Sequence, residues 1–342
     1  MKIGVVGCGK ISDQYFQFAQ TSNKIKIISC TDQVAEKAIY QSSKYSISFV
    51  KSFEEMLLNP EIDTILNLTP PKEHKQITIE SIKSSKHVYS EKPLGINSKE
   101  CNEILEIRKK YNKQICSAPD TFLGAGIQKT KKMIEKNSIG QIVHASAFMV
   151  SPGHEHWHPN PDLYYDTGGG PDLDMAPYYL TTLIYLLGKV KRVTGSHKKT
   201  FATRKILSEP RKGEIIQVET PTHISSILDF HNGVICTMIM SFDTHGSTLP
   251  RIELYGTEGT LYLPDPNSFG GPLKIIKSGE EKWQNIPISE NTGQRGMGLE
   301  DMADSIKNNI VAQTHCQNAA HVVNIIESVR ISSEKNQHIY LN

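Results

Sequence analysis

The chain opens with a strand, a glycine-rich turn and the start of a helix: residues 2–12 read KIGVVGCGKIS. The run Lys2–Val6 predicts a buried strand, and Ser12–Thr21 has the apolar spacing of a helix. In Gly7-Cys8-Gly9-Lys10-Ile11 the first glycine permits a tight turn, and the second lets a pyrophosphate approach the backbone at the helix N-terminus. Ser12 stands where this fingerprint prefers glycine or alanine, so the match is approximate. The stretch predicts the first strand-to-helix junction of a dinucleotide-binding sheet.

The same rhythm continues through the first 118 residues, where short apolar runs alternate with helical patterns. This alternation is the signature of βαβ units and a parallel sheet. Ser52 and Glu55 form a capping box, and Ser98 is the predicted N-cap of a helix. The predicted strands are 2–6, 26–30, 64–68, 87–90 and 114–117, and the predicted helices are 12–21, 34–43, 53–58, 73–84 and 99–111. We therefore expect a doubly wound parallel (Rossmann) domain over residues 1–119.

Beyond residue 119, longer runs rich in β-branched residues follow one another without a helix after each. Such runs favour an antiparallel sheet. The sequence His231-Asn232-Gly233-Val234 predicts a hairpin turn. The predicted strands are 141–150, 190–200, 222–230, 234–242, 251–255, 261–263 and 274–276. A helix over 128–137 precedes them, and the helices 175–187, 299–309 and 319–333 are expected to pack on their sheet. We expect an α+β domain over residues 120–342 with a large, mainly antiparallel sheet.

Composition excludes several classes of protein. A chain of 342 residues predicts about two domains. A net charge of +2 lacks the basic excess of a dedicated nucleic-acid binder. The longest apolar stretch, Tyr178–Leu187, is too short for a membrane span, and the first residues do not read as a signal peptide. Six widely spaced cysteines fit a reducing compartment, so we expect a cytoplasmic protein that binds neither nucleic acid nor membrane.

Charged and polar residues follow the predicted parallel strands. Asp32 ends the second strand, where a carboxylate accepts hydrogen bonds from ribose hydroxyls and repels a 2′-phosphate, which favours NAD over NADP. Thr69-Pro70-Pro71, with His74 one turn on, follows the third strand, and Glu91-Lys92-Pro93 follows the fourth. Ligands of open α/β sheets bind at this edge, so Lys92 is predicted to project its ammonium group into a cleft. Turn chemistry and a solvated charge pair explain the same residues nearly as well.

The segment 151–179 holds a second group of candidates. On a strand, His154, His156 and His158 would share one face and could bind a metal, but nearby proline and glycine favour a loop that lines a substrate cleft. We therefore expect no metal site. Further on, Gly168-Gly169-Gly170 leads into a predicted helix in which Asp174 and Tyr178 lie four residues apart and share one face.

Together these motifs resemble the glucose-fructose oxidoreductase, inositol dehydrogenase and rhizopine-catabolism (Gfo/Idh/MocA) family. The resemblance covers essentially the whole chain, from the glycine-rich turn and Glu91-Lys92-Pro93 to the triple glycine and the late stretch 256–261, GTEGTL. It implies cofactor contacts by Gly7, Gly9, Lys10, Ile11, Asp32, Thr69, Pro70, His74, Glu91 and Lys92. It also implies substrate contacts by Lys92, Asp120, His156, Trp157, His158, Asp174 and Tyr178. Relatives are usually dimers or tetramers, so the resemblance implies a homodimer or homotetramer.

The resemblance implies an NAD(H)-dependent oxidoreductase that acts on a secondary alcohol or hemiacetal carbon of a sugar, polyol or sugar derivative. Tyr178 stands where most members carry the acid/base histidine, as in the glucose-fructose oxidoreductase and dihydrodiol dehydrogenase branches. A nearby Lys92 ammonium favours the phenolate and would lower the pKa of Tyr178. His158, where many relatives have arginine, argues against an obligatory phosphorylated substrate. Two alternatives stay open: an NAD-recycling glycosidase working by oxidation, elimination and reduction, and a non-catalytic nucleotide-sensing regulator.

Overall fold

The computed structural model describes residues 1–341, which divide into two compact units. Unit 1 comprises Met1–Leu123 and Gly293–Val323, and unit 2 comprises Gly124–Thr292 and the chain from Asn324 onward. The two units therefore differ from the predicted ranges 1–119 and 120–342, because residues 293–323 return to the first unit.

Unit 1 is built on a parallel sheet in the order β3-β2-β1-β4-β5-β6. Its strands are β1 (Lys2–Val6), β2 (Lys26–Thr31), β3 (Ser48–Phe49), β4 (Thr64–Asn67), β5 (His87–Ser90) and β6 (Ile115–Ser117). Its helices within the first 123 residues are α1 (Ser12–Thr21), α2 (Ala35–Tyr45), α3 (Phe53–Leu58), η1 (Pro71–Glu73), α4 (His74–Lys83), α5 (Ser98–Tyr111) and η2 (Thr121–Leu123). The strand order reverses between β1 and β4, which confirms the doubly wound prediction. The two-residue edge strand β3 was not predicted, because so short a segment has no period.

The predicted N-cap is right for α3 and is wrong by one residue for α5. Ser52 caps α3, since its side chain accepts a hydrogen bond from Glu55 N at 3.2 Å. Ser98 is not the N-cap of α5. Asn97 takes that place with an extended backbone, and its Oδ1 accepts from Glu100 N at 2.9 Å. Asparagine and serine are near-equal N-caps, so two adjacent candidates cannot be ranked by residue type.

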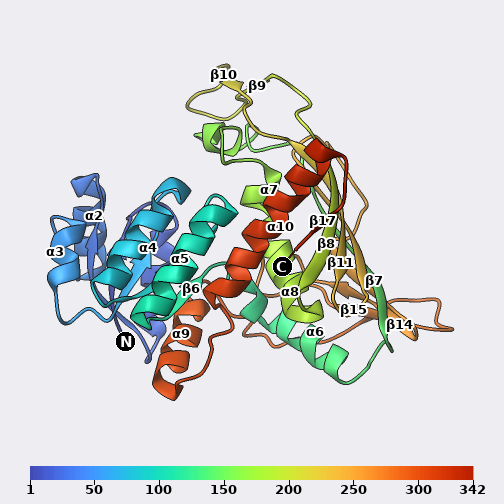
Figure 1. The fold of residues 1–342 in the computed structure, drawn as a ribbon, viewed down its shortest axis with the longest axis horizontal. Coiled ribbons are helices and arrows are strands. Elements are labelled where there is room, and N and C mark those ends of the chain that lie inside the picture. The colour runs from blue at the N-terminus through green and yellow to red at the C-terminus, as the bar shows by residue number, and fades with distance from the viewer. Residues whose placement is uncertain (342) are drawn as a thin grey trace. The chain divides into compact units, whose positions relative to one another are not determined.

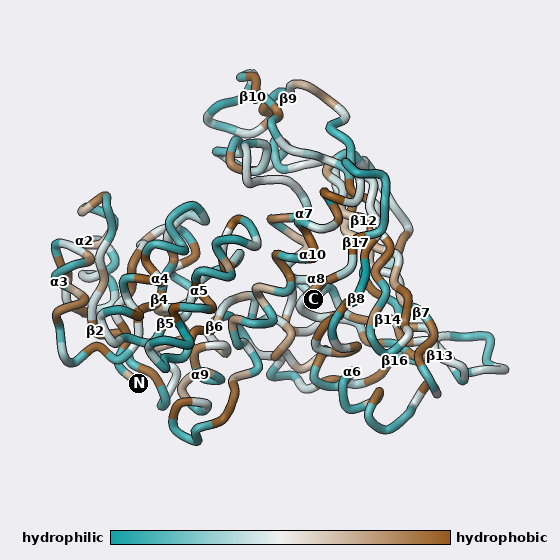
Figure 2. The backbone as a smooth tube through the Cα atoms, in the orientation of Figure 1, coloured by the Kyte–Doolittle hydropathy of each residue, from teal (hydrophilic) through white to brown (hydrophobic). Residues whose placement is uncertain are grey.

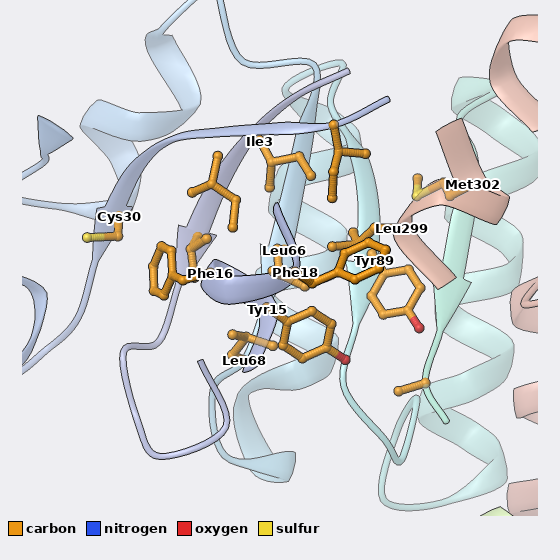
Figure 3. Packing of buried hydrophobic residues seen from close by; sticks show 14 of the residues in the cluster. Ile3, Tyr15, Phe16, Phe18, Cys30, Leu66, Leu68, Tyr89, Leu299 and Met302 are labelled. Atoms are coloured by element: carbon orange, nitrogen blue, oxygen red, sulfur yellow. The ribbon is translucent and has the colours of Figure 1, made fainter. Parts of the chain in front are cut away.

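The core of unit 1 includes a helix from late in the chain. Helix α9 (Met297–Asn308) contributes Leu299 and Met302, both fully buried, to the cluster around Tyr15 and Tyr89 (Figure 3). Leu299 and Met302 lie three residues apart and therefore share a helix face. The prediction that this helix packs on the second sheet was wrong, because an apolar stripe shows that a face is buried but not which sheet buries it.

Unit 2 is built on a large sheet in the order β16-β15-β14-β13-β7-β12-β11-β8-β17. Its strands are β7 (Ile142–Val150), β8 (Val190–Lys198), β11 (His223–Phe230), β12 (Ile235–Ser241), β13 (Ile252–Gly256), β14 (Gly259–Leu263), β15 (Lys274–Lys277), β16 (Gln284–Asn285) and β17 (Ile339–Tyr340). Every pairing is antiparallel except β7 with β12, which confirms the mainly antiparallel prediction. Figure 2 shows that apolar residues recur along these strands. Alternate residues of β12 are buried, so one face of the sheet is covered.

The predicted hairpin turn joins β11 to β12. Gly233 has a φ of +92°, and Phe230 N donates to Val234 O at 2.9 Å. Only the glycine uses the left-handed region. Asn232 acts through its side chain, whose amide donates to Leu187 O and whose carbonyl accepts from Val234 N.

Helices cover one face of the large sheet (Figure 1). They are α6 (Ala125–Glu135), α7 (Pro171–Asp174), α8 (Ala176–Leu187) and the later part of α10 (Cys316–Lys335). Gly195 of β8 lies so close to α10 that a Cβ there would come 2.5 Å from Val329 O. Apart from this sheet, β9 (Thr203–Lys205) and β10 (Ile215–Gln217) form a small antiparallel ribbon, and η3 (Pro161–Tyr164) is a short 3₁₀ turn. Among residues 1–341, no helix has both the length and the apolar character that a bilayer crossing requires.

Candidate active site

The glycine-rich turn of unit 1 has the shape of a phosphate-binding loop. Gly7 has a φ of +97°, and a Cβ there would lie 2.7 Å from the backbone of Leu68, so neither the conformation nor the space suits a side chain. At Gly9 no described atom lies within 4 Å of a built Cβ, which leaves the backbone open to a ligand. Ser12 Oγ donates to Gly9 O at 2.6 Å, so the serine closes the turn by a hydrogen bond.

Asp32 lies beside this loop at the end of β2. Its Oδ2 accepts from Cys8 N at 2.7 Å, and its Oδ1 accepts from Val34 N at 2.8 Å. A carboxylate oxygen accepts more than one hydrogen bond, so both oxygens retain acceptor capacity for ribose hydroxyls. The predicted residues Lys10 and Ile11 complete the turn, with Lys10 exposed and Ile11 at the N-cap of α1. These residues fit an adenine dinucleotide.

Backbone hydrogen bonds bring the predicted cofactor residues of unit 1 to one edge of the sheet. Gly7 N donates to Thr31 O at 2.9 Å, Leu68 N to Val6 O at 2.8 Å, and Glu91 N to Asn67 O at 2.9 Å. The segments after β1, β2, β4 and β5 therefore stay in register beyond the strands themselves. Thr69 and Pro70 follow β4 at this edge, and Thr69 Oγ1 donates to Asn67 Oδ1 at 2.6 Å.

His74, a predicted cofactor contact, has both ring nitrogens against backbone carbonyl groups. Its side chain is fully buried, with Nδ1 2.6 Å from Pro93 O and Nε2 2.8 Å from Thr69 O. Burial lowers the pKa of His74, against the opposing effect of the two carbonyl groups. With both nitrogens occupied, the ring ties the segment after β4 to the segment after β5 and offers no polar atom to a cofactor.

Glu91 anchors the turn that carries Lys92. Its carboxylate is buried, accepting from Tyr15 OH at 2.8 Å and from Lys92 N at 3.0 Å. Arg295 Nη1 lies 3.8 Å from Glu91 Oε1. Glu91 is thus a buried, paired carboxylate below the turn, which excludes the alternative of a solvated charge pair. Its predicted contact with a cofactor has no support from this geometry.

Asp120, which was predicted to line the substrate site, is held by backbone amides within unit 1. The side chain is fully buried, and Oδ2 accepts from Gly296 N at 2.8 Å and Gly298 N at 3.2 Å, at the start of α9. Burial raises the pKa of Asp120, against the opposing effect of Arg295 and these two amides. The carboxylate therefore fixes the returning helix, a partner 176 residues away that the sequence pattern could not reveal.

In unit 2, the histidine-rich segment after β7 is a turn, as the nearby prolines predict. His154 O accepts from both Trp157 N (3.2 Å) and His158 N (2.9 Å), so the three histidines do not share a strand face. His156 is exposed, Trp157 is 58% exposed and His158 is half-buried. Within residues 1–341, no three histidine, cysteine, aspartate or glutamate side chains are grouped as a metal site would require.

His154 contacts the predicted substrate residue Asp174, and sequence reasoning did not single it out. Its Nε2 lies 3.3 Å from Asp174 Oδ2, and its ring stacks on Tyr164 with centroids 3.9 Å apart. The only signal in the sequence was its membership of the histidine cluster. Nothing in the spacing distinguishes it from His156 or His158.

A buried ionic network holds this turn in place. Arg204 Nη1 donates to Glu155 Oε1 at 2.6 Å, and Arg204 Nη2 pairs with Asp243. Tyr165 OH donates to Glu155 Oε2. Burial, followed by the Glu155 carboxylate, raises the pKa of Tyr165. Because removing one member would leave a buried charge unpaired, the network fixes the backbone around residues 152–165.

The triple glycine leads into the helix as predicted, but the helix is broken. Asp174 is the last residue of α7, and Tyr178 lies in the first turn of α8. Met175 separates the two helices. Pro177 has no N–H to donate to the preceding turn, which accounts for the break. Upstream, Asp172 is buried and receives a bidentate pair from Arg330, at 2.6 and 2.8 Å. Asp174 is half-buried and Tyr178 is 8% exposed.

Comparison with known proteins gives two matching family models. The oxidoreductase family model for an NAD-binding Rossmann fold matches residues 1–118, and the GFO/IDH/MocA C-terminal domain model matches residues 127–262. Among curated proteins, the chain is 22% identical to the myo-inositol 2-dehydrogenase of Thermotoga maritima, over 77% of this chain and 75% of that protein. It is also 22% identical to the D-glucoside 3-dehydrogenase of Escherichia coli, over 71% of this chain and 70% of that protein.

Among solved structures, the WlbA dehydrogenase from Bordetella pertussis in complex with NADH and UDP-GlcNAcA is similar, with a TM-score of 0.79 and 18% identity over all of this chain and 98% of that one. This likeness concerns the fold. The two family models together span most of the chain. The chain therefore belongs to the Gfo/Idh/MocA family of NAD-binding oxidoreductases.

Proposed function

We propose that this oxidoreductase moves a hydride between nicotinamide and a secondary alcohol or hemiacetal carbon of a sugar, polyol or sugar derivative. The proposal is carried by the edge of the unit 1 sheet at which β1, β2 and β5 end, where the open backbone at Gly9, the Asp32 carboxylate and Lys92 follow these three strands. Relatives named for inositol and glucoside oxidation support the substrate class.

Three side chains of this chain would act on the substrate. The nicotinamide supplies or takes the hydride, so the protein has to hold the substrate and move a proton to or from its oxygen. Tyr178 is the proposed acid/base. Lys92 has two proposed roles, hydrogen bonding the substrate oxygen and favouring the phenolate of Tyr178. Asp174 is proposed to accept a hydrogen bond from a neighbouring substrate hydroxyl.

A panel of aldoses, inositols, sugar acids and glycosides tests the function. The purified protein is mixed with each compound and NAD, and absorbance of NADH is followed. Turnover of a sugar or polyol is the expected result. Cleavage of a chromogenic glycoside without added cofactor would instead indicate the NAD-recycling glycosidase. Bound NAD with no reduction across the panel would indicate a nucleotide-sensing regulator.

The cofactor preference is proposed to depend on Asp32. NAD should exceed NADP in kcat/KM, and Asp32→Ala should lower kcat/KM for NAD by roughly 10- to 100-fold, the factor for hydrogen bonds to a charged group. The loss should fall mainly on KM, because Asp32 binds the cofactor far from the reacting carbon.

Asp32 also accepts a hydrogen bond from Cys8 N in the glycine-rich turn. A second variant is therefore needed to separate its effect on this turn from its effect on ribose binding. Asp32→Asn keeps one acceptor oxygen for Cys8 N but loses the charge and the acceptor for Val34 N, and it should reduce the ratio of kcat/KM for NAD to that for NADP. Equal use of NADP and NAD by the unaltered protein would contradict the proposal.

His156, Trp157 and His158 are proposed to contact the substrate, and no metal is proposed. His158→Ala should reduce kcat/KM for the sugar by about 2- to 10-fold, the factor for a neutral hydrogen bond, and should leave NAD affinity unchanged. Treatment with a chelator should not change activity. Stoichiometric zinc or manganese in the purified protein, with activity lost on its removal, would reverse this assignment.

We also propose that the chain forms homodimers or homotetramers through the other face of its large sheet. Ile227 of β11 and Ile235 of β12 are 45% and 48% exposed there. Burying such side chains is favourable by about 25 cal/mol per Å² of apolar surface. Light scattering should give a multiple of the chain mass, and the mass of one chain would contradict the proposal.

A further inference from the structure

Asp174, the proposed substrate-binding carboxylate, has a partner from another segment of unit 2. His154 lies in the turn after β7, and its Nε2 is 3.3 Å from Asp174 Oδ2. The two side chains are 12% and 16% exposed. At this distance and burial the contact is much less weakened by water than a surface ion pair.

Aromatic rings fix the orientation of the imidazole. Tyr164 stacks on it at 3.9 Å with an interplanar angle of 20°, and Phe242 approaches it edge-on at 4.7 Å. Trp157 lies at 5.3 Å in a tilted arrangement. With its faces packed, the ring has little freedom to turn, so the direction of its N–H bonds is set before any ligand arrives.

The protonated nitrogen follows from the contacts. A neutral imidazole carries one N–H, and the other nitrogen is an acceptor. Nε2 faces a carboxylate, whereas Nδ1 is buried and has no hydrogen-bond partner among the described residues. A carboxylate accepts and does not donate, so the proton belongs on Nε2, the nitrogen that lies 3.3 Å from Asp174 Oδ2.

The backbone of His154 is also held in place by a hydrogen bond. His154 N donates to Tyr165 OH at 3.1 Å, and that hydroxyl donates in turn to Glu155. Glu155 is paired with the buried Arg204. The histidine is thus anchored to the ionic network that fixes the turn.

We propose that His154 is a positioning residue for Asp174: it donates from Nε2 to Oδ2 and so holds the carboxylate in the orientation in which it meets a substrate hydroxyl. The inference rests on the proposed function, since it assigns to Asp174 the recognition of a sugar or polyol hydroxyl next to the reacting carbon. Without the donor, the carboxylate would lose its fixed orientation and would bind the hydroxyl less well. The effect should therefore fall on substrate binding rather than on cofactor binding.

Two variants of His154 separate orientation from packing. His154→Phe keeps a ring to stack on Tyr164 but removes the donor, and it should raise KM for the sugar by roughly 10- to 100-fold, as for loss of a hydrogen bond to a charged group. The KM for NAD should not change, and kcat should fall much less than KM rises. His154→Gln restores an N–H donor on a flexible side chain and should recover most of the lost affinity.

A matched control uses another histidine near a carboxylate in unit 2. His197 Nε2 lies 3.9 Å from Glu334 Oε1, and His197→Phe should leave both KM values unchanged. If His154→Phe keeps the sugar KM of the unaltered protein, or if the Phe and Gln variants lose affinity equally together with thermal stability, the positioning role is overturned.

A spectroscopic measurement is independent of turnover. In protein labelled with ¹⁵N-histidine, the Nε2–H of His154 should give a ring N–H signal protected from solvent exchange. The signal should be absent from His154→Gln, which assigns it, and lost in Asp174→Leu, which removes the acceptor. A signal that persists in Asp174→Leu would overturn the proposal. If the unaltered protein oxidises no sugar or polyol, the proposed function fails by itself, whatever this signal does.

Discussion

Tyr178→Phe is expected to lower kcat by about 10²- to 10⁴-fold while NAD still binds, because general acid/base groups typically contribute that much. The substitution keeps the ring, which is 8% exposed in the first turn of α8, and removes only the hydroxyl. The change in packing should therefore be small. Stopped-flow measurement of NADH formation with the best substrate of the panel gives kcat, and fluorescence titration gives NAD affinity.

The next residue supplies a matched control. Tyr179 lies on the same helix and is fully buried, and Tyr179→Phe also removes one phenolic hydroxyl. It should change kcat by less than about two-fold, since it is not proposed to touch substrate. In the oxidative direction, kcat/KM of the unaltered enzyme should rise with pH, and this rise should be missing in Tyr178→Phe. If Tyr178→Phe keeps more than about a third of kcat, another group is the acid/base.

Lys92→Met should be at least as damaging, with a loss in kcat of about 10²-fold or more, because it removes both a hydrogen bond to the substrate oxygen and the charge that favours the phenolate. The turn that carries Lys92 is anchored through Glu91 to Tyr15, and the substitution leaves that anchor in place. Melting temperature and NAD affinity should be near those of the unaltered protein. Lys72→Met, which replaces an exposed lysine after β4, serves as the control and should leave kcat unchanged.

Chemical rescue makes this test specific for the ammonium group. All six native cysteines are buried, so in Lys92→Cys the new thiol should react first with 2-bromoethylamine. The product carries an ammonium group at nearly the position of the lysine amine, and activity should return in proportion to alkylation. Alkylation without recovery, or a Lys92→Met variant with more than about a tenth of the original kcat, would contradict the role assigned to Lys92.

The sequence predicted those parts of the fold that depend on interactions between residues close together in the chain. The strand, turn and helix at residues 2–12 could be predicted because the positive φ of Gly7 and the open backbone at Gly9 both belong to a single turn. The alternation of burial along β12 likewise follows from a period of two.

The sequence could not indicate partners that lie far along the chain. Asp120 was assigned to the substrate site, and nothing near it in the sequence indicates that its Oδ2 accepts from the amides of Gly296 and Gly298. His74 was predicted to contact the cofactor, and the sequence did not show that its ring nitrogens lie against carbonyl groups of two different loops. His154 was not separated from its neighbours, because its pairing with Asp174 depends on how two turns fold against each other. A single sequence shows which chemical group a polar residue carries, but it does not show which residue that group will contact.

The return of residues 293–323 to unit 1 affects the protein while it is being synthesised. After Leu123 the ribosome must add roughly 170 residues before Gly293 emerges, which takes on the order of ten to thirty seconds at about 5–20 residues per second. During that time the sheet of unit 1 lacks Leu299 and Met302 from its core, and Asp120 lacks the amides that it will later bind. On the ribosome, the nascent chain therefore exposes the apolar surface that α9 will later cover, and the Asp120 carboxylate lacks its partners. A chaperone can bind this exposed surface. A chain that stops before α9 keeps the surface exposed permanently.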